Sequence, residues 1–271
     1  MEKAAAYVAN SSALVPHSFI KLEMDFKSAE TSFSAGEWKR LVWLCTKKAW
    51  IGTWVSKRDF FKRAWAFLVR KTYFYVKDPK CAVMDDIQSL KDAVAGLPEN
   101  IVSGMRQFLG LSRQEQVEDL AAMALSAVLF FSVAGGIDAE GGLPDLDIKL
   151  FGIGKHRNII THSVLLGFGA EFAMRFILCL ISELHSKLPE DHHKAWDIIA
   201  TVARKSERMA ISAVWLAIGV HLFKDAGLFS SSIKPVVGIP GHHSMFFHKM
   251  FLETNSALST AFSLPVKEKR K

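Results

Sequence analysis

The sequence is poor in the residues that mark strands, flexible segments and fibrous repeats. Of its 271 residues only 17 are Gly and 8 are Pro, while 23% are charged and half are hydrophobic. This composition excludes a disordered chain and a fibrous repeat. Alternating runs of β-branched residues are nearly absent, so the predicted fold class is all-α, a helical bundle. The length permits one large domain or a core with an accessory part.

Cysteine is scarce as well. Cys45, Cys81 and Cys179 are widely spaced and odd in number, which argues against a disulfide framework and against a CxxC metal knuckle. We therefore expect a reducing environment, on the cytosolic side of any membrane. Residues 1–15 lack the unbroken apolar stretch and cleavage site of a secretory signal, so we expect no cleaved leader.

Positive charge is concentrated in one segment. Residues 37–78 contain eleven Lys and Arg against three acidic side chains, within a chain of net charge +7. From Trp38 to Val76, Trp, Phe and Leu alternate with Lys and Arg at intervals near three and four, the pattern of basic amphipathic helices with one aromatic and one cationic face. Such helices suit lipid headgroups, the expected partner, and also nucleic acid, the alternative partner. The oligomeric state stays open.

The chain divides into three predicted regions. We expect residues 1–112 to form a basic, aromatic-rich accessory region facing a membrane, 113–265 the helical core, and 266–271 a basic tail. Residues 120–137 run for eighteen positions without a charge, the lower edge of what crosses a bilayer, and this stretch is either a span or a buried helix. We expect a membrane-associated protein, at the cytoplasmic side of an inner membrane.

Residues that bind metals gather between Pro144 and Asp225. Asp145 and Asp147 are two apart in a segment that Pro and Gly keep from being helical, so both carboxylates can approach one cation. His156 and His162 follow, six apart, and can converge only if His156 lies in the loop or at a helix start. A further pair of such residues, His221 and Asp225, lies later in the chain.

His221 and Asp225 are four residues apart on a predicted apolar helix, so they share one face. Each motif also has a simpler interpretation: a turn or cap for Pro144–Asp147, a hydrogen-bonded core histidine, and an intrahelical hydrogen bond for the His221 and Asp225 pair. Burying His and Asp in an apolar helix is costly without a partner. Taken together, the six residues predict a metal site between helices.

The order of these motifs resembles a known family. PDLD (144–147), HRNIITHS (156–163), HLFKD (221–225) and KPVVGIPG (234–241) resemble the YdjM-type family of predicted membrane-bound, metal-dependent hydrolases. The resemblance covers residues 144–241 and implies metal-dependent hydrolysis. The chain departs from the family pattern in the bulky residues 158–160, where Gly is common, and in having fewer convincing membrane spans.

These observations assign roles to individual residues. Glu171 is a candidate general base, and Arg157 is expected either to balance charge on a phosphoryl group or to hold an Asp. The cofactor is one or two divalent ions, zinc first and Mn or Mg as alternatives, which would activate water on a phosphoester or other ester. The competing hypothesis is a membrane- or nucleic-acid-binding helical protein with a structural metal. The six expected metal ligands are Asp145, Asp147, His156, His162, His221 and Asp225.

Overall fold

The structure, a computed structural model, describes residues 17–139, 141–152, 157–227, 235–239 and 245–264. Within these ranges the chain forms nine helices and no strand, which confirms the all-α prediction. The helices are α2 (His17–Thr31), α3 (Ala35–Lys77), α4 (Pro79–Ala95), α5 (Leu97–Leu109), α6 (Arg113–Ala134), α7 (Leu146–Phe151), α8 (Val164–His185), α9 (Ala195–Asp225) and α10 (Met245–Ser263).

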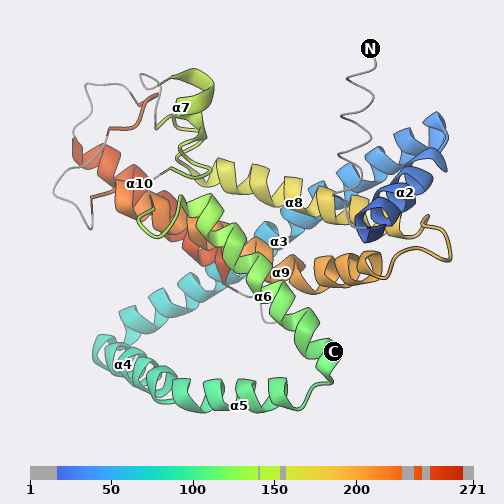
Figure 1. The fold of residues 1–271 in the computed structure, drawn as a ribbon. Helices are drawn as coiled ribbons and strands as arrows, with labels where there is room; N and C mark the ends of the chain where they lie inside the picture. Colours follow the sequence, from blue (N-terminus) through green and yellow to red (C-terminus); the bar gives the residue numbers. More distant parts are fainter. Residues whose placement is uncertain (1–16, 140, 153–156, 228–234, 240–244, 265–271) are drawn as a thin grey trace.

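Helix α9 is the centre of the bundle. It packs against α6, α8 and α10, while α3 packs along the outer side of α8 (Figure 1). The main core lies between α6, α9 and α10 and is made of Val133, Ala134, Val214, Ala217, Ile218, Leu222, Ala226, Val236 and Leu252. Helix α9 supplies four of these nine side chains, more than any other helix, so its position fixes those of the helices around it.

The approach of α8 to α9 depends on one glycine. A side chain at Gly167 would lie inside the indole ring of Trp215, whose own exposure is 0%. Gly169, slightly further along the same helix, has open space where a Cβ would be. The absence of a side chain at 167 therefore lets the two helices pack closely, and it does so just after the segment that carries His162.

The surface by which helix α3 packs differs from the prediction of one aromatic and one cationic face. The basic amphipathic helices predicted from Trp38 to Val76 are a single helix of 43 residues. Its buried stripe consists of residues spaced by four, Leu41, Cys45, Ala49, Thr53 and Lys57. The tryptophans of α3 at positions 43, 50, 54 and 65 are instead 62–71% exposed. The narrow stripe, and not the aromatic residues, is what α3 offers to the bundle.

The number and spacing of the cysteines argued against a disulfide framework, but two of the three cysteines are paired. Cys45 of α3 and Cys179 of α8 form a disulfide, with their Cα atoms 5.5 Å apart, while Cys81 is free and exposed. An odd number of cysteines separated by long stretches does not exclude a single pair that two helices bring together. Disulfides persist in oxidising compartments, so this bond argues against a reducing environment for that part of the bundle.

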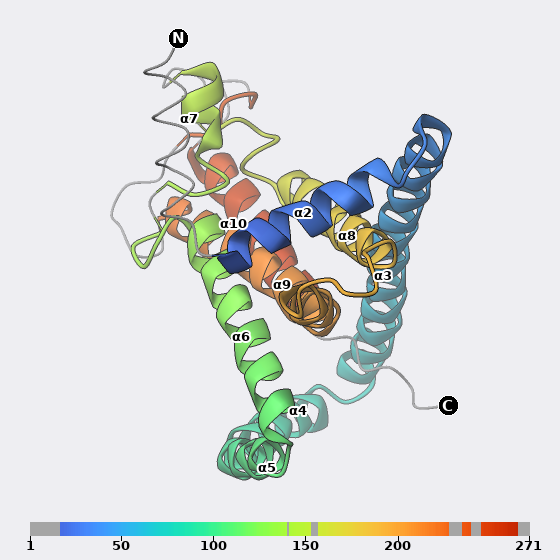
Figure 2. The ribbon, with the colours of Figure 1, turned by 45° about the vertical axis from the view of Figure 1, so that its right-hand side comes forward.

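Helices α4 and α5 connect the end of α3 to the start of α6, along the bottom of Figure 1 and, with α5 nearly end-on, at the bottom of Figure 2. Helix α5 has no buried residue. Helix α6 then begins at Arg113 with a capping box between Ser112 and Glu115, at the position where the sequence places the start of the core. Helix α3, which belongs to the predicted accessory region, packs against α8 of the predicted core.

Among the described residues, two helices have the length and composition to cross a membrane, α6 and α8. The uncharged run of residues 120–137 was expected to be the one candidate. It extends past the helix, because α6 ends at Ala134 and Gly135 takes the left-handed conformation, with φ of 93°. Helix α8 also qualifies by its length and mean hydropathy, although it contains Glu171 and Arg175. These two charged side chains form an ion pair at 3.0 Å.

Candidate metal centre

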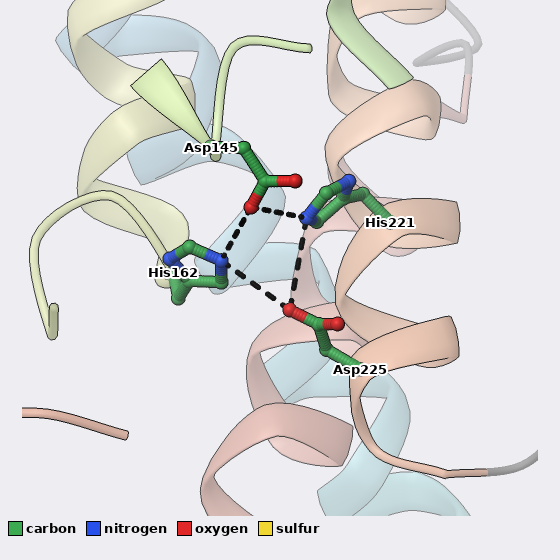
Figure 3. A group of neighbouring side chains, drawn as sticks. All are labelled: Asp145, His162, His221 and Asp225. Atoms are coloured by element: carbon green, nitrogen blue, oxygen red, sulfur yellow. Dashed lines mark ion pairs between the residues drawn. The ribbon is translucent and has the colours of Figure 1, made fainter. Parts of the chain in front are cut away.

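Four of the expected ligands meet at one end of the bundle (Figure 3). Asp145 precedes α7, His162 lies in the turn before α8, and His221 and Asp225 occupy the last turns of α9. One ligand atom from each lies within 4.8 Å of every other. The i, i+4 spacing places His221 and Asp225 on one face of α9, and the folded loops bring the other two residues to that face.

Nitrogen and oxygen atoms alternate around the cluster. Nε2 of His162 lies 3.4 Å from Oδ1 of Asp145 and 3.3 Å from Oδ2 of Asp225. Nε2 of His221 lies 3.5 Å and 3.7 Å from the same two oxygens. Ligand bonds of about 2.0–2.2 Å in a tetrahedral site would place these atoms about 3.3–3.6 Å apart. The cluster therefore has the dimensions of a metal site.

A hydrogen bond at Nδ1 of His221 determines which ring nitrogen of this residue can bind a metal. Its Nδ1 lies 3.1 Å from the carbonyl oxygen of Ala134, which can only accept, so Nδ1 carries the proton. Nε2 then presents a lone pair. This atom is buried and makes no hydrogen bond to any described residue, although two carboxylate oxygens face it. A cation between this nitrogen and the two carboxylate oxygens would give all three atoms a partner, and a buried polar group without a partner is costly.

His162 is held in the same way through a side chain. Its Nδ1 lies 3.0 Å from Oγ1 of Thr161, and that hydroxyl donates to Oδ2 of Asp147 over 2.7 Å. The hydroxyl therefore accepts from Nδ1 of His162, and Nε2 again points its lone pair at the cluster. Histidines that bind metals usually donate their other N–H to such an acceptor, which orients the ring.

Asp147 supports the site instead of joining the four-residue group. Its Oδ2 accepts from the backbone N–H of Asn158, from the Asn158 amide and from Thr161, and Asp147 is fully buried. The sequence could not separate the two aspartates of Pro144–Asp147. Asp145 is the one that reaches the metal-site atoms, and its other oxygen accepts from the N–H of Gly141 over 2.8 Å.

Arg157 closes one side of the cluster. Its Nε donates to Oδ2 of Asp225 over 3.2 Å, and its side chain remains 19% exposed. Its backbone φ is 61°, a left-handed conformation that is uncommon for a residue other than glycine and is frequent at functional sites. Its carbonyl accepts from the N–H of Val237 over 2.8 Å, so the loop after α9 fixes this conformation. The predicted role of holding an aspartate matches this contact.

The electrostatics of the cluster couple its acids to its bases. Burial alone would raise the pKa of Asp145 and Asp225, but the neighbouring imidazoles outweigh it and hold both pKa values well below the ordinary range. Burial alone would lower the pKa of His162, but the two carboxylates raise it above its ordinary value. Both carboxylates are therefore ionised near neutral pH and can serve as ligands.

Glu171 lies in a different cluster. Its carboxylate, 0% exposed, contacts Nζ of Lys57 at 2.7 Å, Nε1 of Trp215 at 2.6 Å and Nε of Arg175 at 3.0 Å. Ser56 donates to it as well. These contacts join α3, α8 and α9 and give Glu171 a packing role. Its predicted role as a base gains no support from them.

His156 lies outside the described residues, so its predicted role as a ligand stays a prediction. Sequence reasoning also missed a second group of ligand-type side chains, His185, His192 and Asp197. The sequence contains a pattern that could have revealed this group, because the two histidines and the aspartate lie within thirteen residues, across a Pro-containing connection between two apolar helices.

Comparison with protein-family models, with curated proteins and with solved structures finds no match to this chain. The resemblance to the YdjM-type hydrolases therefore stays a prediction, carried by the motifs alone.

Proposed function

We propose that this chain is a metal-dependent hydrolase whose centre is formed by Asp145, His162, His221 and Asp225. The observation that carries the proposal is the orientation of the two imidazoles. Each has its Nδ1 beside an acceptor and its Nε2 directed at the carboxylates of Asp145 and Asp225. A hydrogen-bonded core histidine would not need two carboxylates in front of a lone pair.

The ligand set favours particular ions. Two imidazoles suit zinc, iron or nickel better than magnesium, which prefers oxygen ligands. A divalent cation held here would lower the pKa of a bound water and polarise the oxygen of an ester. Four protein ligands fill a tetrahedral zinc, so hydrolysis requires one carboxylate to move aside or an ion that accepts five or six ligands. Manganese meets the latter requirement.

Arg157 supports a phosphoester as the substrate. Its guanidinium lies beside Asp225 and stays partly open to solvent. A planar cation at the open edge of a metal centre can hold the oxygens of a phosphoryl group through paired hydrogen bonds.

Two further features support action at a membrane. Helices α6 and α8 are apolar enough to span one. Helix α3 exposes tryptophans beside lysines and arginines, a combination found at the interface between lipid and water. A substrate with its ester near the membrane surface would fit this arrangement.

The exposed basic and aromatic surface of α3 also favours a second candidate, a lipid- or nucleic-acid-binding protein with a structural metal. The two candidates differ in the effect of metal removal. A structural ion contributes folding energy, so chelation would unfold the bundle. A catalytic ion can be removed and restored with return of activity.

The test is a hydrolysis screen of the full-length protein in detergent, with Zn²⁺ or Mn²⁺, against phosphomonoesters, phosphodiesters and phospholipids. We expect activity in the wild type, a loss of at least about a thousandfold in Asp225→Asn, and full activity in Asp92→Asn, a control carboxylate exposed on α4. No hydrolysis of any ester, together with unfolding on chelation, would favour the structural metal.

A further inference from the structure

A second group of metal-binding side chains lies at the opposite end of α8 from the candidate metal centre. His185 is the last residue of α8, His192 lies in the connection to α9, and Asp197 is in the first turn of α9. The 22 residues of α8 span about 33 Å. The two groups therefore belong to different sites.

The two imidazoles approach the same carboxylate oxygen of Asp197. Oδ1 of Asp197 lies 2.9 Å from Nε2 of His185 and 3.0 Å from Nε2 of His192. The two imidazoles meet edge to face, with centroids 5.5 Å apart. Two nitrogens and an oxygen, all within 4.8 Å of one another, are ligands suited to zinc, copper or nickel.

His192 presents its lone pair to this point. Its Nδ1 lies 2.7 Å from the carbonyl oxygen of Pro189, which can only accept, so Nδ1 is the donor. In the neutral ring Nε2 then has a lone pair, and it faces a carboxylate oxygen at 3.0 Å. Two acceptors at this distance repel each other unless a cation or a proton lies between them.

The connection that holds His192 is fixed in place by α2. The carboxylate of Asp25, which is 5% exposed, accepts from the backbone N–H of His193 over 2.8 Å. Lys21 pairs with Asp191 at 3.1 Å. Ligands held in position in advance lose little freedom when they bind an ion. The arrangement is therefore prepared for an ion in a way that three mobile surface residues would not be.

We propose that His185, His192 and Asp197 form a second divalent-cation site, of zinc type, that fastens the end of α8 to the start of α9. Three protein ligands leave a position for water in a tetrahedral ion. Because Asp197 is 55% exposed on its side chain, the ion exchanges with solvent. This site is independent of the proposed hydrolase activity, since none of its residues lies in the candidate metal centre.

The test is a zinc titration of the full-length protein by calorimetry, with circular dichroism to confirm folding. We expect Asp197→Asn and His185→Ala each to bind one equivalent less than the wild type, or to bind that equivalent at least about tenfold more weakly. Glu190→Gln removes an exposed carboxylate from the same connection and should bind like the wild type. Asp225→Asn should keep this equivalent even if the candidate metal centre is lost.

The proposal is overturned if the folded Asp197→Asn and His185→Ala proteins bind as many zinc ions, with the same affinities, as Glu190→Gln. In that case a proton on His192 occupies the place assigned to the ion. A loss of one equivalent in Glu190→Gln as well would also overturn it, because the effect would then follow from charge in the connection and not from the three ligands.

Discussion

Thr161 offers the most selective test of how the metal centre is built, because it orients a ligand without being one. Its hydroxyl accepts from Nδ1 of His162 and donates to Asp147. Thr161→Val keeps the shape of the side chain and removes both hydrogen bonds. His162 then loses the acceptor that fixes its tautomer, and Asp147 loses a donor while fully buried.

The magnitude follows from the hydrogen bond that orients the imidazole of His162. Partners of metal-binding histidines contribute about 10- to 100-fold to metal affinity, which corresponds to about 1.4–2.7 kcal/mol. We expect Thr161→Val to weaken zinc binding by this amount at the candidate metal centre. The assay is competition with a chelator of known affinity, using the full-length protein. Thr254→Val, an exposed position on α10, is the matched control.

An unchanged affinity in Thr161→Val would refute the reasoning that the hydroxyl links His162 to Asp147. A complete loss of folding in this variant would point instead to a packing role for the turn. Circular dichroism separates these outcomes, since the reasoning requires a folded protein with weaker metal binding.

Three further predictions concern charge and packing. Metal affinity at the candidate metal centre should fall by about tenfold or more between pH 7.5 and 5.5. The reason is that the pKa of His162 is raised, so the metal-free ring keeps a proton that the metal must displace. Calorimetry at several pH values measures this affinity. Lys57→Met should cost about 3 kcal/mol or more in chemical denaturation, because it leaves the buried carboxylate of Glu171 with less compensation. Gly167→Ala should lower the melting temperature, at a cost of about 1–3 kcal/mol, whereas Gly169→Ala should not.

The controls for these predictions use the same chain. Lys62→Met removes an exposed lysine of α3 and should leave stability within about 0.5 kcal/mol of wild type. If it costs as much as Lys57→Met, the buried ion pair is not the reason. Affinity that is constant from pH 7.5 to 5.5 would contradict the contact between His162 and its carboxylates. Equal effects of alanine at 167 and 169 would contradict the close packing on the indole ring.

The sequence predicted what depends on helical periodicity. The i, i+4 spacing placed His221 and Asp225 on one face. The Gly and Pro residues indicated a non-helical segment for both aspartates, which is correct for Asp145 but wrong for Asp147, because Asp147 lies in helix α7. The sequence could not decide between Asp145 and Asp147, because the two carboxylates are oriented by hydrogen bonds from the N–H groups of Gly141 and Asn158, which lie on either side of the segment. Local pattern does not show which carboxylate turns inward.

The sequence did not predict the contacts between residues that are far apart along the chain. Glu171 looked like a base beside the metal because its partner Lys57 lies 114 residues earlier. Cys45 and Cys179 are separated by 134 residues, and only the packing of α3 on α8 brings them together. Such pairings follow from which helix faces meet, a property that no single segment encodes.

The most direct test of the central claim is the metal content of the purified full-length protein, measured by mass spectrometry of the elements after dialysis. We predict that His162→Ala and Asp225→Asn, both folded, each contain one equivalent of divalent metal less than wild type and than Asp92→Asn. Wild-type metal content in both variants, or a wild-type protein that binds no divalent ion, would contradict the account.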